Sequence, residues 1–231
     1  SLKEIKDQSG RSLNIYCDKG RLSSVCDSQG RESSYLYDGN GNLTEIVNSK
    51  GITALKNEYD EKGRTILQRF PDGGIVKYEY LDEQNQVIMT EQNGNRITYE
   101  HDDLFRNTKN IYADGEESFT YNDNNQRTSF TDKRGNTSYY DYDENGAPIG
   151  MRVNGEDYLY RKNLQGDITG IYNPIGNLAV EYTYDAWGKL IDTTGFLSGT
   201  IGEYNSLHYR GYYYDSDAYM LIGLNINLDF N

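Results

Sequence analysis

The sequence is poor in several features that mark common protein classes. It has 3 prolines, 2 cysteines and 1 tryptophan among 231 residues. No apolar run approaches the ~18 residues of a membrane-spanning helix, and no charged start followed by an apolar stretch marks an export signal. A processed or partial chain would begin in the same way. Lys and Arg total 23 against 36 for Asp and Glu, a formal net charge of -13 that disfavours nucleic acid as a partner.

What the sequence has in abundance is tyrosine. Only 35% of the residues are hydrophobic, yet 23 are Tyr, against 6 Phe. Disordered chains lack aromatic residues, so this composition argues against disorder. A tyrosine can bury the faces of its ring while its hydroxyl stays solvated or hydrogen-bonded. The composition therefore favours long strands with a modest, tyrosine-rich core.

Two series of turn residues recur at one shared period of about 21 residues. One series consists of tyrosine or Tyr-Asp positions, and the other consists of glycines that fall between them. The first series is Tyr37-Asp38, Tyr59-Asp60, Tyr80, His101-Asp102, Tyr121, Tyr142-Asp143, Tyr160 and Tyr184-Asp185, and the second is Gly10, Gly30, Gly51, Gly73, Gly94, Gly115, Gly135, Gly155 and Gly176.

Each period contains two strands and two turns, as residues 51–74 illustrate. Residues 52–59 and 64–70 alternate as strands do, and Asp60 to Gly63 form the turn between them. The Asp carboxylate can accept backbone N–H bonds two residues on, and Gly supplies the positive φ that closes such turns. The pattern predicts an all-β antiparallel meander of hairpin repeats with almost no helix.

The alternating Tyr-x-Tyr pairs place aromatic rings on one face of the predicted sheet. Equivalent pairs recur on every second strand, about 9.6 Å apart, so the intervening strands must pack between them. A single hairpin should be unstable alone, whereas stacked units share one continuous face. His101 stands where other repeats have Tyr, which indicates a structural role rather than a catalytic one.

The two cysteines flank one predicted turn. Cys17 and Cys26 lie on either side of Lys19-Gly20, so they could face each other across a hairpin. A disulfide and a pair of free thiols are both compatible with this spacing.

The sequence contains weak matches to metal and catalytic motifs. The stretch Asp141-x-Asp143-x-Asn145-Gly146 resembles the first half of a calcium loop, but Arg152 stands where the bidentate Glu is expected. A hairpin turn is the simpler interpretation. Neither cysteine has a visible activating base, and no nucleophile motif is present. We therefore expect no catalytic residue, no metal site and no cofactor.

Tyr-Asp-x-x-Gly at this period resembles the YD-repeat, or Rhs, family. The C-terminal stretch, from Tyr184-Asp185-Ala186-Trp187-Gly188 through Thr200-Ile201-Gly202-Glu203, resembles the opening of the Rhs-associated core domain. The repeat-signature residues are Tyr37, Asp38, Gly41, Tyr59, Asp60, Gly63, Tyr142, Asp143, Gly146, Tyr184, Asp185 and Gly188, and the core-motif residues are Tyr209, Arg210, Gly211, Tyr212, Tyr214 and Asp215.

This resemblance implies a spiralling ribbon of hairpins that forms a hollow shell around a C-terminal toxin, in secreted or wall-associated bacterial polymorphic toxins. It divides the chain into a YD-repeat ribbon, residues 1–196, and the start of a divergent or truncated core, residues 197–231. After Asp215-Ser216 the sequence departs from the family pattern. No Asp-Pro pair is present, so the family's self-cleavage residues cannot be assigned here.

The sequence thus predicts a non-enzymatic segment of a partial, open or half-open shell, which helps to encapsulate and deliver a toxin. Its partners would be further YD repeats or the toxin domain of a longer protein. The alternative is an extracellular module that binds carbohydrate at cell walls, because rows of tyrosine suit stacking on sugar rings. Buried tyrosines would favour the shell, and tyrosines lining an accessible groove would favour glycan binding.

Overall fold

The computed structural model describes residues 3–215 and 220–222. The chain divides into two compact units, Ser1–Arg106 (unit 1) and Asn107–Asn231 (unit 2), and each is described by itself. The domain boundary expected after residue 196 stays a prediction.

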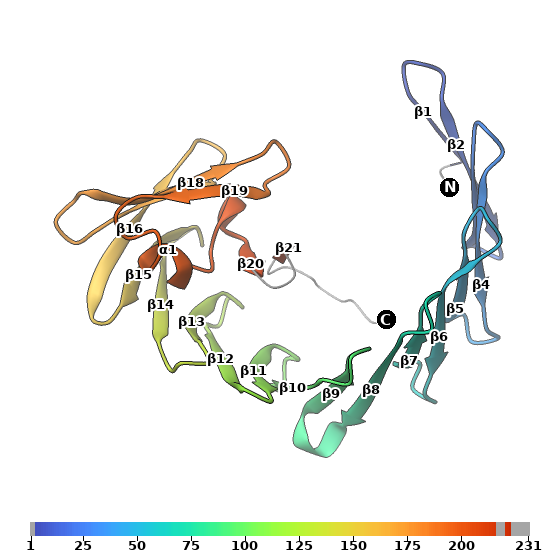
Figure 1. Ribbon diagram of the computed structural model, residues 1–231, viewed down its shortest axis with the longest axis horizontal. Helices are drawn as coiled ribbons and strands as arrows, with labels where there is room; N and C mark the ends of the chain where they lie inside the picture. The colour runs from blue at the N-terminus through green and yellow to red at the C-terminus, as the bar shows by residue number, and fades with distance from the viewer. Residues whose placement is uncertain (1–2, 216–219, 223–231) are drawn as a thin grey trace. The chain divides into compact units, whose positions relative to one another are not determined.

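Unit 1 is an antiparallel meander in which each strand pairs with the next along the chain (Figure 1). Its only helix in the described residues is one 3-10 turn at Asp82–Gln84. The strands are β1 (Glu4–Lys6), β2 (Ser12–Asp18), β3 (Arg21–Asp27), β4 (Glu32–Tyr37), β5 (Leu43–Val47), β6 (Thr53–Tyr59), β7 (Thr65–Arg69), β8 (Ile75–Leu81), β9 (Gln86–Thr90) and β10 (Arg96–His101).

Unit 2 continues the same antiparallel pattern and then leaves it. After the last meander strand come the short helix α1 (Ile201–Tyr204), a 3-10 turn at Tyr209–Gly211, and the strand pair β20 (Tyr213–Asp215) and β21 (Met220–Ile222). The meander strands are β11 (Asn107–Tyr112), β12 (Gly115–Tyr121), β13 (Arg127–Thr131), β14 (Thr137–Tyr142), β15 (Pro148–Val153), β16 (Glu156–Lys162), β17 (Ile168–Tyr172), β18 (Leu178–Tyr184) and β19 (Leu190–Thr194).

The turns use the chemistry that the sequence predicts. In the turn after β6, the Asp60 carboxylate accepts the backbone N–H groups of Lys62 and Arg64, both at 2.9 Å. Gly63 has a φ of 78° and donates its N–H to the Asp60 carbonyl. A register shift at the end of the strand, between Glu58 and Tyr59, accompanies the turn. Turn after turn repeats this geometry, and the expected all-β antiparallel meander is confirmed.

The turn at Lys19-Gly20 is a two-residue hairpin whose residues have φ of 48° and 82°. Both are positive, as the tight turn favoured between twisted strands requires. The register pairs Cys26 with Asn14 and Cys17 with Leu22, so the two cysteines do not stand opposite each other. Both thiols are free in the structure.

In unit 1 the two faces of the sheet differ in chemistry. On β8, Tyr78 and Tyr80 are half-buried, whereas Lys77 and Glu79 alternate with them and are exposed. Strand β6 follows the same rule, with Asn57 buried between exposed charged neighbours. We call the face that carries the Tyr-x-Tyr pairs the tyrosine face.

The hydrophobic core lies in unit 2. Every fully buried hydrophobic side chain in the described part of the chain belongs to this unit. Residues 196–212, which we call the covering segment, pack on the tyrosine face of β14–β18, and Figure 1 shows α1 beside these strands. The core consists of Tyr140, Met151, Val153, Tyr158, Tyr160, Ile168, Ile171, Ala179, Val180, Tyr182, Ile201 and Leu207.

Candidate functional site: the tyrosine face

One hydrogen bond recurs along the tyrosine face and explains why the repeat uses Tyr rather than Phe. The tyrosine nearest the end of one strand donates its hydroxyl to a backbone carbonyl of the preceding strand. That carbonyl belongs to the first residue of the preceding strand, which directly follows a turn capped by Asp or Asn. Each bond therefore ties one repeat to the repeat before it. We call these bonds tyrosine clasps. They join Tyr59 to Leu43 (2.6 Å), Tyr80 to Thr65 (2.9 Å), Tyr121 to Asn107 (2.7 Å), Tyr142 to Arg127 (2.7 Å) and Tyr184 to Ile168 (2.8 Å).

The clasps correct one position of the repeat alignment. The turn that precedes β17 begins at Asn163, which caps the N–H groups of Gln165 and Asp167 as Asp does elsewhere. Lys162, rather than Tyr160, is therefore the residue just before this turn. Tyr160 stands two residues earlier, in the buried position that Tyr182 occupies on β18. The cause is that Lys162 stands where the other repeats have Tyr or His, so the nearest aromatic residue is Tyr160.

His101 occupies a tyrosine position without making a clasp through its ring. The ring lies against Phe105, with centroids 5.0 Å apart, and Nδ1 is 3.0 Å from the Asp102 carbonyl. These local contacts agree with a structural role for His101.

In unit 1 the tyrosine face carries a chain of side-chain amides. Asn57 is buried and donates to the hydroxyl of Tyr59 at 3.2 Å. Gln68 donates to Asn57 and accepts from Tyr78, at 3.2 and 3.1 Å. Burial raises the pKa of Tyr78 above its usual value. The hydroxyls are satisfied by neighbouring strands, but the rings remain half-exposed.

In unit 2 the covering segment supplies the hydrogen-bond partners of Tyr160 and Tyr182. Asn205 is only 2% exposed, and its Oδ1 accepts from the Tyr160 hydroxyl at 2.8 Å. Its Nδ2 lies 3.3 Å from the hydroxyl of Tyr182, which in turn donates to the Gly202 carbonyl at 3.0 Å. One carboxamide thus joins tyrosines from two strands to a segment that follows the repeats.

His208 makes the second polar anchor of the covering segment. Its Nε2 lies 3.0 Å from the Asn205 carbonyl, and its Nδ1 lies 3.2 Å from the Tyr184 hydroxyl. The ring packs edge-on against Tyr182, with centroids 4.7 Å apart. Burial lowers the pKa of His208 to about 4, since a charged imidazole would lose its hydration there.

The predicted signature residues hold the turns. Asp38, Asp60, Asp143 and Asp185 each accept two backbone N–H groups. The matching glycines, Gly41, Gly63, Gly146 and Gly188, all have positive φ. The stretch that resembles a calcium loop is therefore a capped turn at Asp143. Among residues 3–215 and 220–222, no cluster of three or more His, Cys, Asp or Glu suited to a metal is found.

The core-motif residues lie beside the covering segment. Tyr209, Arg210 and Gly211 form the 3-10 turn, and Arg210 donates its N–H to the buried carboxylate of Asp167 at 3.2 Å. Tyr212 follows at its C-cap, and Tyr214 and Asp215 belong to β20. Most of the departure from the family pattern, residues 216–219 and 223–231, lies outside the described residues. No helix in the described part is long and apolar enough to cross a membrane.

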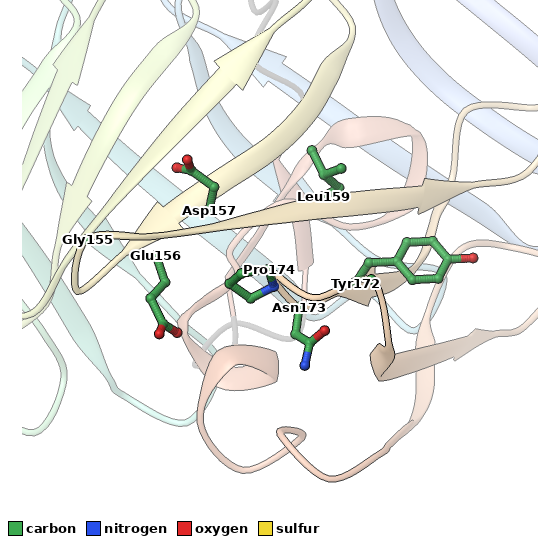
Figure 2. Close-up of a pocket in the computed structure, with 8 residues that line it drawn as sticks. Gly155, Glu156, Asp157, Leu159, Tyr172, Asn173 and Pro174 are labelled. Atoms are coloured by element: carbon green, nitrogen blue, oxygen red, sulfur yellow. The ribbon is translucent and has the colours of Figure 1, made fainter.

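A shallow groove lies at the turn ends of β16 and β17 (Figure 2). Leu159, which is 60% exposed, lines it together with Tyr172 and Pro174. Carboxylates stand at its rim: Asp157 pairs with Arg152 at 2.6 Å, and Glu156 accepts from the Tyr158 hydroxyl at 2.9 Å. This groove offers an apolar floor with hydrogen-bond acceptors around it.

The capped turns, the clasps and the antiparallel pairing define a repeat protein built from β-hairpins. Comparison with known proteins gives the same answer: residues 16–53 match the RHS Repeat family. The chain is 29% identical over 211 residues to the tRNA3(Ser)-specific nuclease WapA of Bacillus spizizenii, an alignment that covers 82% of this chain and 9% of the nuclease. Residues 16–53 therefore match an RHS repeat, and the chain is similar to RHS (YD) repeat proteins, as its sequence indicated.

Two further similarities are more distant. Teneurin-3 of Danio rerio is 26% identical over 229 residues, which cover 88% of this chain and 8% of the teneurin. Among solved structures, the Photorhabdus luminescens Tc holotoxin pore aligns at 12% identity with a TM-score of 0.49, over 82% of this chain and 13% of that chain. The chain spans less than a tenth of the length of the two curated relatives.

Proposed function

We propose that the chain is a non-enzymatic segment of an RHS shell, which helps to encapsulate and deliver a toxin carried by a longer polypeptide. The protein would act outside the cell or at the cell wall of a bacterium. In this proposal the repeats do no chemistry. The nuclease activity named for WapA would then belong to a part of that protein outside the 9% matched here.

The proposal rests on the observation that polypeptide covers the tyrosine face in unit 2. In unit 2 the face is an acceptor surface for polypeptide, because the covering segment buries Ile201 and Leu207 against it and Asn205 engages two tyrosine hydroxyls. Unit 1 presents the same kind of face with half-exposed tyrosines. A shell wall needs one face that receives polypeptide and another, charged face that stays in water.

The test uses the natural polypeptide that contains this chain together with all of its repeats. Limited proteolysis should spare sequence enclosed by the shell while the wall remains intact. Tyr78→Asp on the tyrosine face should expose the enclosed sequence to protease, whereas Glu79→Lys on the charged face should not. If the sequence outside the repeats is cleaved as fast in the unchanged protein as after denaturation, the shell proposal is wrong.

A second candidate function is supported by the groove in Figure 2. An exposed apolar floor beside Asp157 and Asn173 suits a sugar ring, whose C–H face stacks on aromatic or aliphatic carbon while its hydroxyls donate to the rim. Binding of peptidoglycan fragments that is lost in Tyr172→Ala would favour a wall-binding module. Unchanged binding in that variant, or none in the original chain, would remove this alternative.

A further inference from the structure

Two neighbouring turns of unit 2 carry large apolar side chains at their tips. Leu164, in the turn Asn163–Asp167, is 107% exposed, and Trp187, in the turn Asp185–Lys189, is 88% exposed. The turn backbone does not require apolar residues there. Three equivalent turns carry only polar or charged residues at their tips, namely Glu61-Lys62, Asp123-Asn124 and Glu144-Asn145.

The covering segment joins these two turns into one surface. A Cβ built at Gly188 would lie 2.5 Å from the ring of Tyr209, so this ring rests on the turn of Trp187. The next residue, Arg210, donates its N–H to Asp167 at the end of the turn of Leu164. We call the surface formed by Leu164, Trp187, Lys189, Tyr209 and Arg210 the tip surface.

The tip surface is cationic although the chain as a whole carries a net charge of -13. Lys189 and Arg210 are exposed, and neither forms a salt bridge within the described part of the chain. The two carboxylates nearby are engaged by the backbone. Asp185 accepts the N–H groups of Trp187 and Lys189, and the buried Asp167 accepts from Arg210. Asp167 is buried and Asp185 is partly buried, so Lys189 and Arg210 are the most exposed charged groups of this surface.

We propose that the tip surface docks on an anionic lipid bilayer, with Trp187 and Leu164 entering the headgroup region and Lys189 and Arg210 meeting the lipid phosphates. Indole rings suit the boundary between headgroups and acyl chains, where one end of the ring is apolar and the other is wet. Basic side chains near an anionic surface add attraction. A fluid bilayer can close around two protruding turns, whereas a standard protein partner would need a matching surface of roughly 800 Å².

Trp187 is the only tryptophan in the chain, so its fluorescence reports on this surface alone. The full chain is titrated with vesicles of phosphatidylglycerol and, in parallel, with vesicles of phosphatidylcholine. We expect a blue shift of the emission and co-sedimentation with the phosphatidylglycerol vesicles, and little of either with phosphatidylcholine. The double variant Lys189→Gln, Arg210→Gln should bind phosphatidylglycerol at least about tenfold more weakly.

Leu164→Ser should weaken vesicle binding at least about tenfold, because a leucine side chain that leaves water for an apolar phase is stabilised there. Ile175→Ser is the matched control, since Ile175 is 80% exposed at a turn of the other series in the same unit and should leave binding unchanged. Circular dichroism confirms that each variant is folded.

An emission that does not change with excess phosphatidylglycerol at low salt would overturn the proposal. Equal binding to both lipids would overturn the role given to Lys189 and Arg210. A blue shift that depends on protein concentration without vesicles, and disappears in Leu164→Ser, would show instead that the surface binds a second copy of the chain.

Discussion

Unit 1 and unit 2 are built from the same repeat, yet its tyrosine face is covered in unit 2 and partly exposed in unit 1. In unit 2, the covering segment buries Tyr140, Tyr158 and Tyr182 almost completely. In unit 1 the rings at the corresponding position, such as Tyr35 and Tyr78, are half-buried, and the Tyr78 hydroxyl donates to the Gln68 amide of its own sheet. The repeat therefore satisfies the polar groups of the face by itself, whereas burial of the rings needs polypeptide from elsewhere.

The largest expected effect comes from removing the most buried contact of the covering segment. Leu207 is fully buried, so Leu207→Ala should destabilise unit 2 by about 2–5 kcal/mol. Denaturant unfolding followed by near-ultraviolet circular dichroism measures this, because the fully buried tyrosines lie in unit 2. Leu55→Ala, at a half-buried position of unit 1, is the control and should leave this transition in place. An unchanged midpoint in Leu207→Ala would mean that the covering segment does not hold the core.

Acid should lower the free energy of unfolding of unit 2, because His208 is buried in its neutral form. The folded-state pKa, about 4, lies below the ordinary value of 6.5, so the unfolded chain binds the proton more readily. Stability should be complete above about pH 6.5 and fall by about 3 kcal/mol as the pH drops toward 4. His208→Gln should flatten this part of the pH profile of unit 2 unfolding, followed by near-ultraviolet circular dichroism. A profile with the same slope in the variant would assign the pH dependence to other groups.

The tyrosine clasps should stabilise unit 1 and unit 2 equally, because they do not depend on the covering segment. Tyr59→Phe in unit 1 and Tyr142→Phe in unit 2 each remove one hydroxyl-to-carbonyl bond, at 2.6 and 2.7 Å. Each should cost about 1 kcal/mol of local stability. Hydrogen exchange of the amides in β5–β6 and β13–β14 measures both losses. A loss confined to unit 2 would show that the clasp matters only where the face is covered.

The smallest effect is expected at the cysteines. Because both thiols are free and pair with other residues across the hairpin, Cys17→Ser should change stability by less than about 0.5 kcal/mol. Labelling of the unreduced, denatured chain with a maleimide should modify both cysteines. A chain that takes up no label before reduction would restore the disulfide alternative.

The turns and strands of this architecture can be predicted from short stretches of the sequence. Asp60 and Gly63 specify their turn through contacts four residues apart or less, and the alternation around Tyr78 specifies a strand and its face. Where Lys162 replaces the tyrosine before a turn, the pattern predicts the wrong position, because Tyr160 is then the nearest aromatic residue.

The covered part of the site was not predictable in this way. Asn205 binds Tyr160 across 45 residues of sequence, and His208 binds Tyr184 across 24. Neither Asn205 nor His208 belongs to the repeat, so no periodic signal points to either. Their roles follow from tertiary packing, which no local spacing specifies.

The most direct test of the account is a footprint of tyrosine accessibility on the whole folded chain, by iodination or nitration with mapping of the modified peptides. We expect Tyr35, Tyr78 and Tyr99 of unit 1 to react, while Tyr140, Tyr158, Tyr160 and Tyr182 of unit 2 stay protected until the chain is unfolded. Equal reactivity of the two sets would contradict the claim that residues 196–212 cover one part of the face and leave the other open to a partner.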